Sequence, residues 1–204
     1  MKILIAVPTF ETISPDTFKS IYGLDPGGHW CVFDFVRGYD CATARNNIAQ
    51  QAMNEEADYV FMVDNDVVLP PDALINLLDD AKDVCLGYYP NRNLQNVYDG
   101  KTSVCRMGEL NYTLQYPSLE MQALRDTGQF KIQIHGGGMG CAMIRTELFR
   151  KLSYPWFDWV NYADRGILSE DLFFCEKCGQ AGIPVYTDTR VGCGHLLRRV
   201  EWPH

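Results

Sequence analysis

The sequence predicts an α/β fold with a mostly parallel central sheet flanked by helices, and a small antiparallel portion in the second half. Two observations carry this prediction. Apolar runs typical of buried strands alternate with segments of helical periodicity over residues 1–89. Beyond residue 90 the alternation weakens into turn-rich sequence and then resumes. Because 47% of the 204 residues are hydrophobic, one sizeable core is possible, and we expect a single domain over residues 1–204.

The first strand is expected over residues 2–7, because an unbroken apolar run that ends in Pro-Thr is typical of a central parallel strand. A helix should start at Ser14-Pro15-Asp16, which supplies a cap, a proline in the first turn and an acid near the positive end. The same reasoning predicts the other elements of this half: a strand over 29–36, a helix over 42–56, a strand over 58–63, a helix opened by Pro70-Pro71-Asp72 and a strand over 84–89.

In the second half, residues 90–126 are rich in loop-forming residues and predict a short hairpin followed by a helix around residues 119–125. Regular elements then return: a strand over 130–134, a glycine-rich segment over 135–140, a strand over 141–144, a short helix over 146–152, a helix capped by Ser169 that ends near 179–182, and a strand over 184–187.

Charge and hydropathy exclude several classes of partner. The formal net charge of −8 argues against broad electrostatic binding to nucleic acid or to an anionic membrane, both of which need a basic face. No apolar run approaches the roughly 20 residues that span a bilayer. The first apolar run stops at Pro8, which is too early for a signal peptide, so we expect a cytoplasmic protein.

The eight cysteines are scattered through apolar segments, as is typical of free buried thiols in a reducing cytosol. Cys175 and Cys178 form a C-x-x-C motif within a helical pattern. A second such pair is missing, so zinc would need two ligands from elsewhere. Two packed helix cysteines are the simpler interpretation.

Two carboxylates interrupt the most strand-like run of the sequence. Asp64 and Asp66 follow the apolar residues 59–63, at the carboxyl end of a predicted strand, where ligands of open α/β sheets gather. Along an extended chain, residues i and i+2 point to one side. Two carboxylates so placed suit a hard divalent cation such as Mg²⁺ or Mn²⁺. The alternative is a turn rich in Asp and Asn between strand and helix.

Seven short motifs together resemble the family 2-like glycosyltransferases of GT-A fold, including short bacterial and phage members. They are Ala6-Val7-Pro8-Thr9, Ala44-Arg45-Asn46-Asn47, residues 59–66, residues 70–74, residues 136–140, residues 169–174 and Gly194-His195. The resemblance runs from residue 3 to about residue 197. It implies a GT-A-like domain, with a nucleotide-sugar-binding half over 1–89 and an acceptor and catalytic half over 90–204.

The resemblance also implies an activity. A sugar would move from a nucleoside-diphosphate sugar, with a UDP-sugar favoured, to an acceptor hydroxyl by an inverting, metal-dependent mechanism. Asp66 would be the main ligand of Mn²⁺ or Mg²⁺, and His195 would complete the metal site. Asp64 would lie nearer the ribose and is also expected as a metal ligand. The expected donor-binding residues are Pro8, Thr9, Glu11, Arg45, Asn46, Asp64 and Asn65.

Glu170 and Asp171 open a predicted helix and match the E-D motif of the family. The resemblance implies that Asp171 is the general base on the acceptor hydroxyl and that Glu170 supports it. The alternative is ordinary stabilisation of a helix N-terminus by acids. For the acceptor we expect backbone N–H groups at Gly137 and Gly138, with a tight turn as the alternative, and an aromatic contact from Trp156, with a core position as the alternative.

Two other functions compete with glycosyl transfer. A nucleotidyltransferase would use a similar sheet, but a glycine-rich, basic phosphate loop after the first strand is missing. A non-catalytic relative that binds a sugar or a nucleotide would not need the acids, whereas Asp64, Asp66, Glu170, Asp171 and His195 are all present. The released product separates the three: a nucleoside diphosphate, pyrophosphate or neither.

Overall fold

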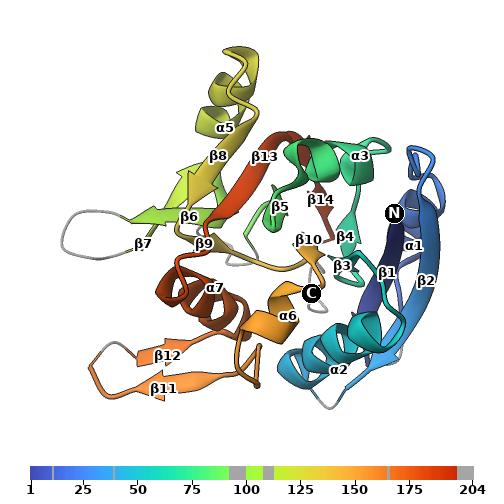
Figure 1. The fold of residues 1–204 in the computed structure, drawn as a ribbon. Coiled ribbons are helices and arrows are strands. Elements are labelled where there is room, and N and C mark those ends of the chain that lie inside the picture. The colour runs from blue at the N-terminus through green and yellow to red at the C-terminus, as the bar shows by residue number, and fades with distance from the viewer. Residues whose placement is uncertain (11, 39, 92–99, 108–112, 165, 197–204) are drawn as a thin grey trace, which may run out of the picture.

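The computed structural model describes residues 1–204 except 11, 39, 92–99, 108–112, 165 and 197–204. A sheet in the order β2-β1-β3-β10-β5-β13-β8 forms its centre (Figure 1). The strands are β1 (Lys2–Thr9), β2 (Trp30–Arg37), β3 (Tyr59–Val63), β5 (Val84–Tyr88), β8 (Lys131–Ile134), β10 (Cys141–Arg145) and β13 (Val185–Gly192).

The sheet is mixed, and its antiparallel strands come from the second half of the chain. β1 pairs in parallel with both β2 and β3, and β5 pairs in parallel with β13. β10 runs antiparallel to both of its neighbours, β3 and β5, and β8 runs antiparallel to β13. The predicted α/β fold with an antiparallel portion from the second half is therefore confirmed. The sequence did not indicate that β10 inserts at the centre of the sheet.

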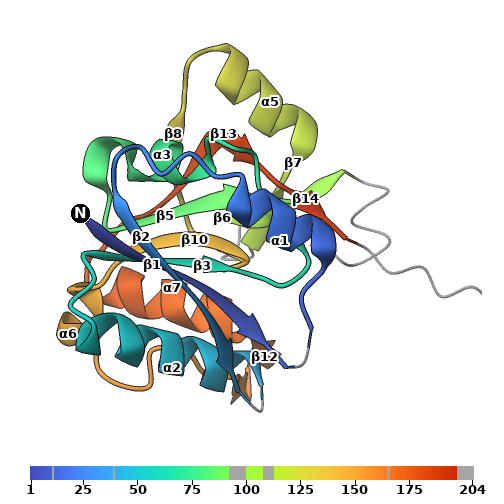
Figure 2. The ribbon, with the colours of Figure 1, turned by 90° about the vertical axis from the view of Figure 1, so that its right-hand side faces the viewer.

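Helices cover both faces of the sheet (Figure 2). One face carries α2 (Cys41–Asn54), α6 (Leu148–Lys151) and α7 (Glu170–Gln180), and the other carries α1 (Pro15–Tyr22) and α3 (Ala73–Leu78), which runs into the short 3₁₀ helix η1 (Asp79–Ala81). Side chains of β1 alternate between the two resulting cores, because successive residues of a strand point to opposite faces. Leu4 packs on the α2 side, whereas Ile3 and Ile5 pack on the α1 side.

Side-chain caps stabilise the starts of two helices, of which the Ser14 cap was predicted from the sequence. The Ser14 side chain accepts a hydrogen bond from the Asp16 N–H at the start of α1, and Pro15 occupies the first turn. Asp40 caps α2 by accepting from the backbone N–H and the hydroxyl of Thr43. The Asp40 cap fixes where α2 begins, and so which of its first residues face the sheet.

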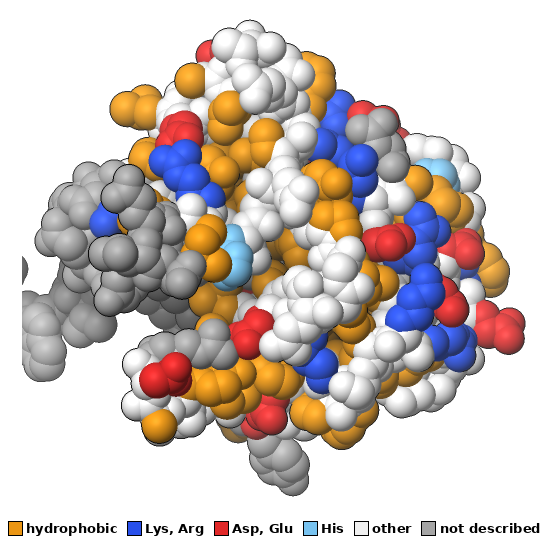
Figure 3. All heavy atoms as spheres, turned by 60° about the vertical axis from the view of Figure 1, so that its left-hand side comes forward, with side chains coloured by type: hydrophobic (Ala, Val, Ile, Leu, Met, Phe, Trp, Pro, Cys, Tyr) orange, Lys and Arg blue, Asp and Glu red, His pale blue; other side chains and the backbone are white. Residues whose placement is uncertain are grey.

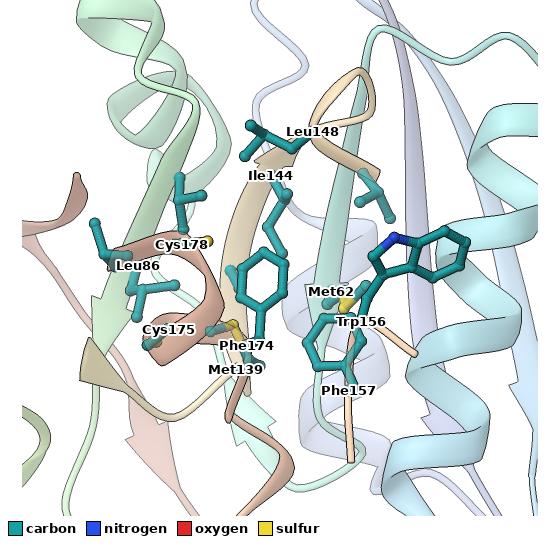
Figure 4. Packing of buried hydrophobic residues seen from close by; sticks show 14 of the residues in the cluster. Met62, Leu86, Met139, Ile144, Leu148, Trp156, Phe157, Phe174, Cys175 and Cys178 are labelled. Atoms are coloured by element: carbon teal, nitrogen blue, oxygen red, sulfur yellow. The ribbon is translucent and has the colours of Figure 1, made fainter. Parts of the chain in front are cut away.

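The core between α7 and the sheet is aromatic. Phe174 of α7 stacks on Phe157 at a centroid distance of 4.8 Å (Figure 4). Phe149 packs against both rings. Cys175 and Cys178 are buried on the same helix, as expected for packed thiols.

Within the described part of the chain, no group of three or more His, Cys, Asp and Glu side chains could hold a metal ion.

Smaller units surround the main sheet. β6 (Lys101–Met107), β7 (Thr113–Pro117) and β9 (Gly136–Gly137) form a three-stranded sheet, and α5 (Ser118–Asp126) follows β7, so the expected hairpin and helix are confirmed. Two further pairs were not expected: β11 (Val160–Tyr162) with β12 (Gly166–Leu168), and β4 (Val67–Val68) with β14 (Gly194–His195).

The distribution of charged side chains and the hydropathy of the helices agree with what the composition indicates. On the face drawn in Figure 3, the Lys and Arg side chains are interspersed with Asp and Glu, and the described residues there form no broad basic patch. Among the described residues, no helix combines the length and the apolar character that crossing a membrane requires.

Candidate functional site

The candidate site lies where β1 and β3 end side by side. The two strands are parallel with Ala6 opposite Met62, so the residues that follow them meet at one edge of the sheet. The turn after β3 is tied to the segment after β1, because the Asn65 side chain donates to the Thr12 carbonyl and the Ser14 N–H donates to the Asn65 carbonyl. The Asn65 amide group is thus engaged within the protein.

Asp64 and Asp66 do not point to one partner. The Val67 N–H donates to the Asp64 carbonyl, so residues 64–67 form a turn and the alternation of an extended chain does not apply. The Asp64 Oδ1 accepts from Arg45 Nη2 at 2.8 Å. The Asp66 Oδ1 instead lies 3.7 Å from His195 Nε2. The chain therefore forms the turn that was the alternative, and the two acids on it face different groups.

The β4–β14 pair brings His195 to Asp66. Gly194 and His195 pair with Val68 and Val67, and the Leu196 N–H donates to the Asp66 carbonyl. The His195 Nδ1 lies 2.7 Å from the Pro90 carbonyl oxygen. Because a carbonyl can only accept, this contact assigns the proton of the neutral ring to Nδ1 and leaves Nε2 as the nitrogen that faces Asp66.

This pair fits a divalent metal. A carboxylate oxygen and an imidazole nitrogen 3.7 Å apart are the donor types that suit Mn²⁺, and the Pro90 carbonyl orients the imidazole as second-layer partners of metal-binding histidines do. Asp64 does not join the pair in the described conformation, because its carboxylate faces Arg45. The prediction of Asp64 as a metal ligand is not supported by this geometry.

Arg45 is buried at the centre of a cluster of acids. Its side chain is 2% exposed, its Nε lies 3.3 Å from Asp171 Oδ1 and 3.6 Å from Glu170 Oε1, and its Nη2 bonds Asp64. Burial alone would lower the pKa of the guanidinium, but the three carboxylates outweigh it and raise that pKa. Although Arg45 lies in the first turns of α2, its side chain is therefore not solvated.

Asp171 has the character of a base at neutral pH. Burial raises the pKa of its carboxyl to about 7, and the nearby Glu170 and Asp64 carboxylates act in the same direction. The Arg45 guanidinium and the Met139 N–H oppose this rise. A general base works best when its pKa lies near the working pH. Glu170 is more deeply buried, with a side chain that is 6% exposed.

Two expected ligand contacts are structural instead. Asn46 is buried, its Nδ2 donates to the Phe157 carbonyl, and its Oδ1 accepts from the N–H groups of Trp156 and Phe157. Trp156 is 5% exposed, and its indole N–H donates to the Phe149 and Leu152 carbonyls. The geometry favours a structural role for both: Trp156 occupies the core position that was its alternative, and together the two residues anchor residues 156–157 on α2.

The glycine-rich segment packs against Tyr89. The Gly138 N–H donates to the Ser103 carbonyl, and the Gly140 N–H donates to the Tyr89 hydroxyl. A Cβ at Gly140 would lie 2.7 Å from that hydroxyl, so glycine is required there by close approach. Gly137 is buried in β9. The Gly138 N–H is thus engaged within the protein, and residues 139–140 form a turn of the kind given as the alternative. The acceptor contacts expected of Gly137 and Gly138 stay predictions.

The residues after β1 are only partly described. Pro8 is buried in β1 opposite Val36, and Thr9 is half-buried with its hydroxyl donating to the Thr12 carbonyl. Glu11 lies outside the described residues. The donor roles of Pro8 and Thr9 stay predictions.

Tyr89 is the residue of the site that sequence reasoning missed. It is buried, accepts from the Gly140 N–H, and packs edge-on against His195 with ring centroids 5.1 Å apart. Burial raises the pKa of its phenol well above the usual range, and the Asp64 and Asp171 carboxylates add to the rise. The signal in the sequence that could have found Tyr89 was its position at the end of the predicted strand over 84–89, next to Pro90.

Comparisons with known proteins agree with the fold. The model of the family "Glycosyl transferase family 2" matches residues 18–153. The crystal structure of A197 from STIV aligns over 100% of both chains, with a TM-score of 0.63 and 18% identity. A structure of GalNAc-T7 with UDP, GalNAc and Mn²⁺ aligns over 98% of this chain and 44% of its own, with a TM-score of 0.64 and 12% identity. At these identities the two structures show a shared fold. No curated protein sequence matches the chain.

Proposed function

The chain belongs to glycosyl transferase family 2, and from this premise we propose that it transfers a sugar from a nucleoside-diphosphate sugar to an acceptor hydroxyl with inversion. One observation carries the proposal: a candidate metal pair, Asp66 with His195, and a candidate base, Asp171, occur at the same sheet edge, with Arg45 and Asp64 between them. Leaving-group stabilisation and proton removal are the two tasks of such a transfer.

Asp66 and His195 would hold Mn²⁺ or Mg²⁺. The ion would supply positive charge against the diphosphate that leaves with its nucleoside. UDP is the favoured nucleotide, because the GalNAc-T7 structure of the same fold was obtained with UDP and Mn²⁺. Pro8, Thr9 and Asp64 flank this pair on the side of β1 and β3 and would contact the nucleoside.

Asp171 would remove the acceptor proton. The acceptor oxygen attacks the anomeric carbon, its proton passes to the Asp171 carboxylate, and the bond between the sugar and the diphosphate breaks. A carboxyl with a pKa of about 7 is a sufficient base for this transfer and regains its ionised form near neutrality. Glu170 would keep Arg45 in place.

The exposed Trp159 replaces Trp156 as the aromatic residue proposed for the acceptor. Trp159 is 53% exposed and directly precedes β11. Val160 pairs with Leu168, so continuing this register sets Trp159 opposite Ser169, the residue before Glu170 and Asp171. An exposed indole near this point of the chain is suited to stacking on a sugar ring.

Thermal melting with nucleoside diphosphates tests the proposal first. The measurement compares UDP, GDP, CDP and dTDP, each with and without Mn²⁺, on the wild type and on Asp66→Ala. Because ligands that bind the native state raise its melting temperature, a Mn²⁺-dependent shift with one nucleotide is expected, and it should be lost in Asp66→Ala.

Asp72→Ala is the matched control, since Asp72 is an exposed carboxylate without a side-chain capping bond. It should keep the wild-type shift. No shift with any nucleotide would contradict the proposal. Release of pyrophosphate from a nucleoside triphosphate, in place of a diphosphate from a nucleotide sugar, would identify a nucleotidyltransferase instead.

A further inference from the structure

Arg45 joins acids that come from distant parts of the chain. Asp64 belongs to the turn after β3, whereas Glu170 and Asp171 open α7. The Arg45 guanidinium contacts all three, at 2.8 Å from Asp64, 3.3 Å from Asp171 and 3.6 Å from Glu170. A single cation therefore links the donor side of the proposed site to its base.

The guanidinium is oriented toward the protein and away from solvent. Arg45 is 1% exposed as a residue. Its Nη2 is bonded to Asp64, its Nη1 lies 3.4 Å from the Met139 carbonyl, and its Nε faces the two acids of α7. Each of the three guanidinium nitrogens thus faces a protein oxygen, and the burial of the group keeps a bound diphosphate from its remaining N–H donors.

From these contacts we infer that Arg45 is a positioning residue, which holds the Asp171 carboxylate in place and couples it to Asp64, and that it is not a ligand of the donor. The inference rests on the proposed function, because it assigns the base role to Asp171. It differs from the sequence-based expectation, which made Arg45 a donor contact.

The charged surroundings of Asp171 explain why a cation is needed there. Among the described residues, the groups that interact electrostatically with Asp171 lie on α2 and α7, in the turn after β3, directly after β5 and before β10. They are Arg45, Cys41, Asp64, Tyr89, the Met139 N–H, Glu170 and Cys175. Arg45 is the cation of this set, and the other ionisable groups are acids. Without it, three carboxylates would repel one another in a buried site.

A thermal double-mutant cycle tests the coupling without any substrate. It compares the wild type, Arg45→Gln, Asp171→Asn and the double variant above about pH 8, where the Asp171 carboxyl is ionised. If Arg45 neutralises Asp171, then Asp171→Asn should raise the melting temperature more in the Arg45→Gln background than in the wild type. Equal shifts in both backgrounds would overturn the inference. If Arg45→Gln alone does not fold, recovery of folded protein in the double variant gives the same support, and failure of the double variant overturns it.

A second experiment separates positioning from donor binding. Arg45→Lys keeps the charge but not the planar fork, and Arg145→Lys is the matched control because Arg145 pairs with Asp83 at the far end of β10. Binding of UDP with Mn²⁺ is titrated, and UDP release from a UDP-sugar, with water as the acceptor, is followed between about pH 5.5 and 9.

Arg45→Lys should bind UDP with Mn²⁺ as the wild type does, release UDP at least ~10-fold more slowly at neutral pH, and reach its full rate only at higher pH. Arg145→Lys should match the wild type in UDP affinity, in the rate of UDP release and in its pH dependence. Weaker UDP binding with an unchanged pH profile would make Arg45 a donor ligand and overturn the inference. Failure of the wild type to bind or turn over would instead contradict the proposed function, while the thermal cycle would still decide the role of Arg45.

Discussion

His195 Nε2 lies 3.7 Å from Asp66 Oδ1, although the two residues are far apart in the sequence. The contact depends on the short β4–β14 pair, in which His195 lies opposite Val67. The Pro90 carbonyl and the Tyr89 ring fix the imidazole from its other sides. The candidate metal pair is thus built by three segments that meet only in the folded protein.

His195→Gln should abolish the Mn²⁺-dependent part of nucleotide binding. The amide cannot replace the imidazole nitrogen, so the pair with Asp66 is lost. Calorimetric titration of UDP with Mn²⁺ should show at least ~10-fold weaker binding than the wild type, the loss that changes around a metal commonly cause. His29→Gln is the control, because His29 lies in the turn before β2. Metal-dependent binding that survives in His195→Gln would contradict the assignment.

Activity should rise with pH through about 7. The Asp171 carboxyl must be ionised to accept a proton, and its pKa is raised to about 7, mainly by burial. The rate should therefore be low at acidic pH and level off above neutrality. Measuring UDP release across the pH range tests this, with the UDP affinity followed in parallel. A rate that is flat through neutrality would exclude Asp171 as the titrating base.

Asp171→Asn should raise stability at high pH while it removes activity. The carboxyl has an ordinary pKa of 3.8 and a folded-state pKa of about 7, so the folded protein binds this proton more tightly than the unfolded chain does. Its contribution is favourable at acid pH, is lost as the pH rises from about 4 to about 7, and stays lost above that. Asn cannot ionise, so the variant does not lose this contribution to stability as the pH rises.

The expected gain in melting temperature is about 2–4 °C for each kcal/mol of removed repulsion. It should appear at pH 8 and vanish near pH 4, and thermal scans at the two pH values measure it. An equal effect at both pH values would show that the substitution acts through packing instead of charge.

Truncation should destabilise the protein strongly at Trp156 and hardly at all at Trp159. Trp156→Ala removes a buried indole with two hydrogen bonds and should cost about 3–5 kcal/mol of unfolding free energy. Trp159→Ala removes an exposed ring and should change stability by less than about 0.5 kcal/mol. Denaturant unfolding measures both. A large loss in Trp159→Ala would argue against its proposed role at the acceptor.

Local patterns in the sequence were sufficient for most elements. The caps at Ser14 and the apolar runs of β1, β3 and β5 specify their own secondary structure, because strand and helix periodicities are properties of neighbouring residues. Partner choice is not local. The apolar run of β10 gave no sign that it would separate β3 from β5, and two-residue strands such as β4 and β14 have no periodicity to detect.

The same limit applies to the site. Asp66, His195 and Asp171 could be proposed from motifs, because their residue types suit a metal or a base. Asn46 and Trp156 belong to similar motifs, but their hydrogen-bonding groups are used within the fold. Only the packing of residues 156–157 on α2 distinguishes these two cases. Arg45 required the structure for a further reason, since its acids come from two separate segments.

The central position of β10 has a consequence for synthesis of the chain. β3 and β5 are complete once residue 88 has been made, yet neither can close the middle of the sheet until residues 141–145 arrive between them. A chain that ends near residue 89 would expose the edges of β3 and β5 and would tend to aggregate. On the ribosome, the two halves should therefore acquire protease resistance together, late in translation, and β14 with His195 should be among the last parts to dock.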